Sequence, residues 1–139
     1  MIVLDTNVLS ALMLAEPEIV VASWLDQQPP TSVWTTSITI FEIRYGLAAM
    51  PAGRRRTERH ALFERLVEEK LERRVLSYDY AAAEEAAALM DKRRRAGRIG
   101  ELRDTMIAGI ALAQRATLAT RNVRHFDDLS VPVVDPWSA

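Results

Sequence analysis

The stretch Ile2-Val-Leu-Asp-Thr-Asn7 decides the fold, because it joins a short apolar strand directly to the start of a helix. An uninterrupted apolar run at residues 2–4 is typical of a strand that is covered on both faces, and Asp5 ends it. Either of the two residues after Asp5 can cap a helix that continues to Leu14. A strand followed at once by a helix is the first half of the unit that builds parallel sheets.

The same alternation continues along the chain. Runs of apolar and β-branched residues predict further strands at 33–36, 75–78, 117–120 and 131–134. Helical spacing of apolar residues predicts helices from residue 17 to the Pro29-Pro30 pair, and at 37–50, 54–72, 80–95 and 102–115. Strands that alternate with helices favour a three-layer α/β/α sandwich. We therefore expect residues 1–139 to form a single α/β domain with a mostly parallel five-stranded sheet.

The composition excludes several classes of site and of protein. The 139 residues are 49% hydrophobic and 27% charged, which is the balance of an ordinary soluble domain. The chain has no cysteine and only two histidines, so thiolate zinc sites, disulfide scaffolds and three-histidine metal sites are excluded. No apolar run reaches the roughly 18 residues of a membrane helix, and the first residues lack the pattern of a signal peptide. We expect a cytoplasmic protein with no membrane partner.

Three acidic residues lie where a parallel sheet collects its ligands, beyond the carboxyl ends of the strands. Asp5 directly follows the first strand, Glu42 lies in the helix after the second, and Asp104 opens the helix before the fourth. Each has an ordinary structural alternative when it is considered alone. Asp5 can be a helix cap, Glu42 a surface residue paired with Arg44, and Asp104 a first-turn acid that stabilises its helix.

Taken together, the three acids indicate a metal site. Two carboxylates 4 Å apart repel each other by about 4 kcal/mol at an effective dielectric constant near 20, so such a cluster needs a cation or bound protons. Because cysteine and a suitable histidine set are missing, the ligands would be oxygens, which suit Mg²⁺ and Mn²⁺. Hydrolysis of a phosphodiester is the commonest work of such a site.

Four further blocks accompany the opening segment Met1–Ser10, in order along the chain. They are Thr39-Ile-Phe-Glu-Ile-Arg-Tyr-Gly-Leu47, Arg103-Asp-Thr-Met-Ile-Ala-Gly-Ile-Ala111, Ala119-Thr-Arg-Asn122 and Val133-Val-Asp-Pro-Trp137. With these blocks the whole chain resembles the PIN-domain family, and more narrowly the VapC/FitB toxins of type II toxin–antitoxin pairs. The resemblance implies an endoribonuclease that depends on Mg²⁺ or Mn²⁺, a homodimer, and a cognate VapB/FitA-like antitoxin.

The resemblance also implies roles for individual residues. The catalytic and metal-binding acids of the family fall on Asp5, Glu42 and Asp104, and Thr6 and Thr120 match hydroxyl positions that line the site. A fourth catalytic position, which is often acidic in the family, is Asn122 here. Because an amide carries no charge, this departure argues against tight binding of a second metal ion.

Two questions stay open at the level of sequence. The basic run Arg93, Arg94 and Arg95 precedes Asp104 by a short glycine-containing loop and is a possible RNA contact, although such runs also serve as solubilising turns. The main alternative function is a catalytically silent PIN-like module that binds RNA or an antitoxin without cleavage. A phospho-acceptor switch is a weaker alternative, because Arg121 stands where such a domain needs lysine and the acceptor strand is missing.

Overall fold

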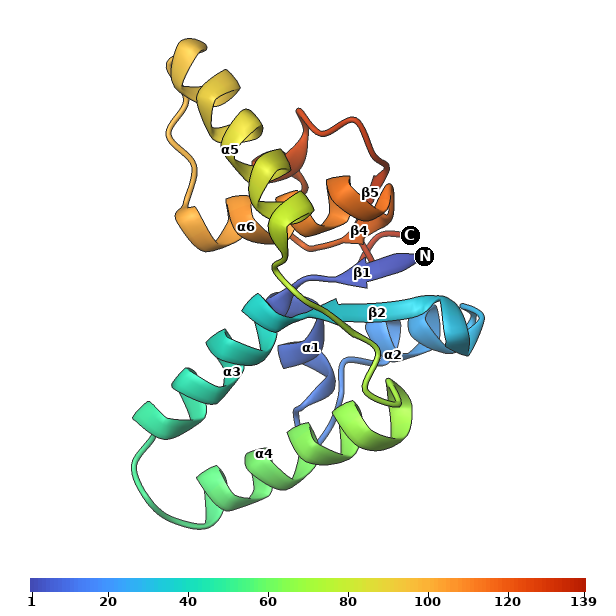
Figure 1. The fold of residues 1–139 in the computed structure, drawn as a ribbon. Helices are drawn as coiled ribbons and strands as arrows, with labels where there is room; N and C mark the ends of the chain where they lie inside the picture. The colour runs from blue at the N-terminus through green and yellow to red at the C-terminus, as the bar shows by residue number, and fades with distance from the viewer.

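A computed structural model describes all of residues 1–139, and a five-stranded sheet runs through its centre (Figure 1). The strands are β1 (Ile2–Leu4), β2 (Val33–Thr36), β3 (Val75–Leu76), β4 (Thr117–Ala119) and β5 (Val133–Val134). Neighbouring strands pair in parallel, in the order β3-β2-β1-β4-β5. Since all strands run the same way, their carboxyl ends meet at one edge of the sheet, with β1 in the middle.

Six helices cover the two faces of this sheet. They are α1 (Thr6–Leu12), α2 (Ile19–Asp26), α3 (Ser37–Ala49), α4 (Arg54–Arg65), α5 (Tyr80–Arg95) and α6 (Leu102–Gln114), with short turns η1 (Pro30–Ser32), η2 (Leu66–Lys70) and η3 (Val123–Phe126). Figure 1 shows α5 and α6 above the sheet and the first four helices below it. The predicted three-layer sandwich and parallel sheet are therefore confirmed.

Successive residues of β1 pack into two hydrophobic cores, one on each face of the sheet. The side chains of Val3 and Leu4 are both fully buried, on opposite faces of the sheet. Val3 packs with Ile107 and its neighbours in the core under α5 and α6, whereas Leu4 packs in the core of the first four helices with residues such as Phe63. This two-sided burial explains why the first strand contains no polar residue before Asp5.

The helices α5 and α6 pack unusually closely, through Gly109. A Cβ atom on this glycine would lie 2.5 Å from the carbonyl oxygen of Ala82 and 2.7 Å from the Cβ of Ala86. The close approach packs the second half of α6 against the N-terminal half of α5, and so holds the helix that carries Asp104 in place.

Several predicted elements differ from the observed ones: the third strand covers only Val75–Leu76 of the predicted 75–78, and the second helix begins at Ile19 rather than at residue 17. The first helix ends at Leu12 rather than Leu14, and Asp5 is its N-cap. The helix expected over 54–72 ends at Arg65 and continues as the π turn η2. The last strand begins only at Val133, because Pro132 has no N–H to donate to the ladder. No helix of the chain is long and apolar enough to cross a bilayer.

Candidate active site

Asp5 lies at the centre of the candidate site, at the carboxyl end of β1. Its carboxylate accepts hydrogen bonds from the backbone N–H of Thr6 at 2.8 Å and from the hydroxyl of Thr120 at 2.8 Å. The residue is only 3% exposed. Burial, together with the nearby charges of Asp104 and Glu42, raises the pKa of Asp5 from 3.8 to about 6, against the lowering effect of these hydrogen bonds. Asp5 thus caps α1, and its charged form is destabilised by burial and by the neighbouring acids.

Glu42 reaches the same region from α3. The hydroxyl of Thr6 donates to Glu42 Oε1 at 3.0 Å and lies 3.0 Å from the hydroxyl of Thr39. Because the backbone N–H of Thr6 donates to Asp5, Thr6 links Glu42 to Asp5. The guanidinium of Arg103 lies 3.8 Å from Glu42 Oε2. The ion pair with Arg44 that the sequence allowed is not formed, because Arg44 pairs with Glu64 instead.

Asp104 approaches from the first turn of α6. The ring nitrogen Nδ1 of His125 lies 3.5 Å from Asp104 Oδ2. Burial and the charge of Glu101 raise the pKa of Asp104, whereas His125 and Arg103 act in the opposite direction. Glu101, rather than Asp104, caps α6, because its carboxylate accepts from the backbone N–H of Asp104 at 2.9 Å. Asp104 does not cap the helix, but it lies in the first turn of α6, where an acid stabilises the helix as the ordinary alternative expected.

The structure thus brings the three predicted acids to one edge of the sheet, where their charges act on Asp5. The guanidinium of Arg103 and the imidazole ring of His125 stand against the outer acids. No three acidic or histidine side chains are spaced to hold a metal ion together. The three acids are neighbours, but in this arrangement they do not surround a common point where a metal ion could bind.

Comparison with known proteins places this arrangement in a family. The model of the PIN domain matches residues 2–131. The chain belongs to the PIN-domain family. The predicted resemblance is confirmed, and the three acids of this PIN domain lie at the carboxyl edge of its sheet.

Two relatives and one solved structure cover nearly the whole PIN domain. "VapC ribonuclease Y4jK" of Sinorhizobium fredii is 40% identical over 137 residues, covering 99% of this chain and 98% of that protein. "Toxin FitB" of Neisseria gonorrhoeae is 31% identical over 137 residues, with 99% of each chain covered. A structure of FitAB bound to an IR36 DNA fragment is similar with a TM-score of 0.88 and 31% identity, covering 99% of this chain and 96% of that one.

Asn122, the fourth predicted site residue, follows β4 at the same edge of the sheet. Its backbone N–H donates to the hydroxyl of Thr120 at 3.1 Å, and the same hydroxyl donates to Asp5. The Asn122 residue is exposed. Thr120 therefore links Asn122 to Asp5, and Thr6 and Thr120 both line the site through hydrogen bonds to the acids or their neighbours.

The predicted RNA contacts need a correction at Arg93. Only 3% of Arg93 is exposed, and its guanidinium donates to both carboxylate oxygens of Asp128 at 2.9 Å. It also donates to the carbonyl of His125 at 2.8 Å, so Arg93 ties η3 to α5 and cannot reach RNA. Arg94 and Arg95 are exposed, and both pair with Asp91 on their own helix.

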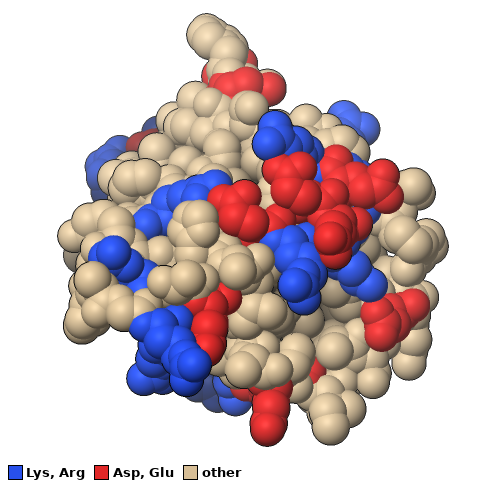
Figure 2. All heavy atoms as spheres, turned by 90° about the horizontal axis from the view of Figure 1, so that it is seen from below, with Lys and Arg blue, Asp and Glu red and all other residues tan.

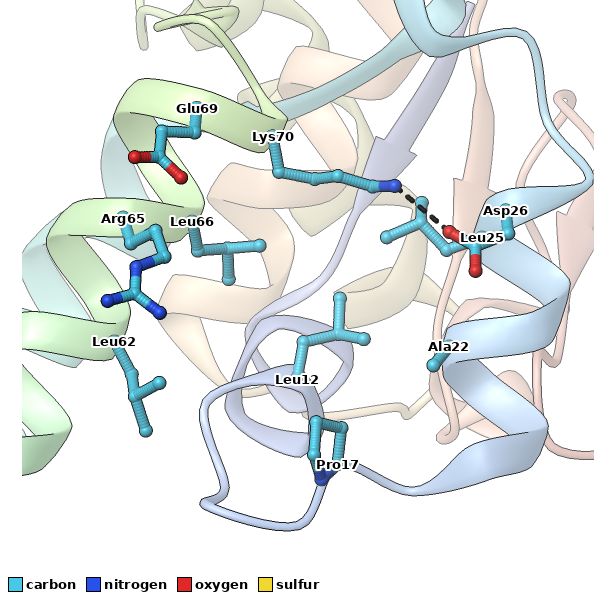
Figure 3. A pocket seen from close by; sticks show the side chains of 10 residues that line it. All are labelled: Leu12, Pro17, Ala22, Leu25, Asp26, Leu62, Arg65, Leu66, Glu69 and Lys70. Carbon is cyan, nitrogen blue, oxygen red and sulfur yellow. Dashed lines mark hydrogen bonds and ion pairs between the residues drawn. The ribbon is translucent and has the colours of Figure 1, made fainter.

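One groove of this PIN domain contains none of the three acids. A groove of about 380 Å³ lies between α1 and α2 on one side and the end of α4 on the other. Figure 3 shows Leu12, Leu25 and Leu66 around it, with the amino group of Lys70 directed to Asp26 across its rim at 3.0 Å. It is not a reaction site, since it collects leucine side chains and lacks a cluster of acids.

Proposed function

We propose that this PIN domain is the toxin of a type II toxin–antitoxin pair and an endoribonuclease that hydrolyses RNA with Mg²⁺ or Mn²⁺. The observation that carries the proposal is the buried carboxylate of Asp5, whose pKa is raised to about 6 by burial and by its acidic neighbours. A protein does not keep a destabilised acid beside two others without a use for it. The relative named a VapC ribonuclease supports the same activity.

The donor set fits a hard divalent cation. Asp5, Glu42 and Asp104 supply carboxylate oxygens, with hydroxyls of threonine beside them and no thiolate, which is the chemistry that Mg²⁺ and Mn²⁺ prefer. A cation held by these three acids would lower the pKa of a bound water and stabilise the charge that develops on a phosphodiester. Its positive charge would also relieve the repulsion that the two neighbouring acids exert on Asp5.

The residues of the chain itself orient these acids. The N–H of Thr6 and the hydroxyl of Thr120 fix the two oxygens of Asp5, and the hydroxyl of Thr6 holds Glu42. Arg103 neutralises Glu42 in the metal-free chain, as His125 does Asp104 when its ring is protonated. Because Asn122 adds an amide in place of a fourth acid, the site carries one charge less than a four-acid PIN site. We propose one tightly bound ion rather than two.

The partners proposed for the chain follow from its relatives. FitAB, which resembles this chain closely, is an assembly that binds DNA, and we propose a VapB/FitA-like antitoxin here. Three carboxylates are a natural receptor for a guanidinium group, so an antitoxin arginine would compete with the metal ion. We further propose a homodimer, in line with the stacked and exposed rings of Phe41 and Tyr45 on α3.

One observation favours the alternative of a silent binding module. The three acids are not spaced to hold a metal ion together, and basic side chains, Arg103 and His125, already stand against two of them. In that case the site would receive an arginine of a partner protein and cleave nothing. The two functions differ in a single reaction, so one assay separates them.

The test is cleavage of single-stranded RNA by the purified protein in Mg²⁺, in Mn²⁺ and in EDTA. We expect cleavage with either metal ion and none in EDTA. Glu42→Gln and Asp104→Asn should reduce it to the level of a control without enzyme, because each removes a metal-binding charge. Glu84→Gln, an exposed change on α5, is the matched control and should leave the rate unchanged. Intact RNA with the wild-type protein in both metals would favour the silent module.

A further inference from the structure

A second pocket opens directly beside Asp104. It has a volume of about 300 Å³, and its walls come from the loop before α6, the first turn of α6 and the turn η3. This volume is at the lower end of the range for small-ligand sites, which suits a single unit of a larger chain. Because Asp104 belongs both to this pocket and to the acidic site, a molecule that occupies one lies next to the other.

Three arginines line the pocket together with the carboxylates of Glu101 and Asp104, and only some of these arginines can bind a ligand. Arg93 lies in its wall and is neutralised by Asp128. Arg98 pairs with Asp127 at 3.1 Å, and both side chains of that pair are largely exposed, at 42% and 61%. Exposed pairs of this kind contribute only about 0–1 kcal/mol, so an incoming anion can replace Asp127.

Arg124 is the free cation of the pocket. It is exposed, and the ion pairs of this region join Arg98 to Asp127 and Asp128 while leaving Arg124 without a carboxylate. The guanidinium of Arg98 lies 3.4 Å from the carbonyl oxygen of Arg124, so the two arginines are neighbours. A pair of guanidinium groups that line one pocket matches the oxygens of a phosphate diester.

We propose that this pocket binds the backbone phosphate next to the cleaved bond in single-stranded RNA, through Arg98 and Arg124. The inference rests on the proposed ribonuclease function and adds to it the place where the substrate is held. The acids of the active site repel a phosphate chain, and two arginines beside Asp104 offset that repulsion where it is strongest. They act without reading the base sequence, because their target is the backbone.

The other basic run of the chain is less suited to this role. Residues 54–59 lie on α4, where Arg54 pairs with Glu58. Figure 2 views the molecule from below, the side on which α4 lies in Figure 1, and shows the basic side chains in several separate groups, with acidic side chains gathered at the upper right. The pocket that Arg56 of this run lines contains none of the three acids, in contrast to the pocket of Arg98 and Arg124.

The test is the affinity for a fluorescent single-stranded RNA, measured by anisotropy in EDTA over a range of salt concentrations. Arg98→Gln and Arg124→Gln should each reduce the slope of log affinity against log salt by about 0.7, which is about a fivefold loss of affinity at 0.1 M salt. Arg124→Lys keeps the charge and should keep the slope. Arg55→Gln, an exposed change on α4, is the matched control and should also keep it.

Slopes of wild-type size in both glutamine variants would overturn the proposal, as would an equal loss in Arg55→Gln or a wild-type protein that does not bind RNA. The failure of the proposed function has a different signature. A wild-type protein that binds RNA with the expected arginine dependence but cuts none in Mg²⁺ or Mn²⁺ would leave the pocket in place and remove the ribonuclease.

Discussion

Replacement of Asp5 by asparagine should stabilise the metal-free protein, although it removes a central residue of the site. The pKa of Asp5 rises from 3.8 to about 6 in the folded chain, mainly because of burial. At 1.36 kcal/mol per pKa unit, the charged form costs about 3 kcal/mol of folding free energy above pH 6. Asparagine has nearly the same shape and no charge, so Asp5→Asn should recover up to about 3 kcal/mol at pH 7.5.

The sign of the pH dependence follows from the same shift. Between pH 4 and pH 6 the folded protein holds a proton on Asp5 that the unfolded chain has lost, so the stability of the wild type falls as the pH rises. Below pH 4 both states are protonated and the cost disappears. The advantage of Asp5→Asn should therefore be near zero at pH 4 and complete above pH 6.

The assay is urea unfolding in EDTA at pH 4, 5 and 7.5, followed by circular dichroism. Asp79→Asn is the matched control, because Asp79 caps α5 by accepting from the backbone N–H of Ala82 at 2.9 Å and asparagine caps equally well. Its stability should stay within about 0.5 kcal/mol of the wild type at pH 7.5. A loss of stability in Asp5→Asn at pH 7.5, or a gain that is the same at all three pH values, would refute the reasoning and leave Asp5 a structural cap.

Three further predictions concern packing, a buried ion pair and the fourth site position. Gly109→Ala should lower the unfolding free energy by about 1–3 kcal/mol in urea melts, because the new methyl group would meet a carbonyl of α5. Gly46→Ala places its methyl group in open space on α3 and should raise the unfolding free energy by up to about 1 kcal/mol. Arg93→Gln should cost about 2–3 kcal/mol at pH 7, because it removes the hydrogen bonds of a buried guanidinium to Asp128 and to the carbonyl of His125, although Arg98 stays 3.4 Å from Asp128. An equally small loss in Arg93→Gln and in the exposed Arg94→Gln would contradict this. Asn122→Asp should tighten Mn²⁺ binding in calorimetry, and unchanged or weaker affinity would remove Asn122 from the site.

The strands and the three acids could be predicted because their signals are local. Residues 2–4 form an apolar run of the kind that only a doubly covered strand needs, and Asp5 stands at its end. The helix over 54–72 was wrong in its second half, since a sequence pattern cannot show where a π turn shifts the phase. Phe63 is the buried residue of α4, and Leu71 is buried after the turn.

The contacts of the basic residues could not be predicted, because their partners are distant in the chain. Arg93 belongs to a run that reads as a solvated helix end, yet its carboxylate partner, Asp128, comes 35 residues later. The pairing of Arg103 with Glu42 depends in the same way on how α6 meets α3. Charge patterns within one helix say nothing about such pairs, so the cations around the acids are visible only in the structure.

Calorimetric titration of Mn²⁺ into the purified protein at pH 7.5, without RNA, tests the central claim most directly. We predict one binding event per chain in the wild type, and at least a tenfold weaker affinity in Glu42→Gln and in Asp104→Asn. Glu84→Gln should bind like the wild type, because its side chain is exposed on α5. Mn²⁺ binding of equal strength in all four proteins, or none in the wild type, would contradict a metal site formed by these acids.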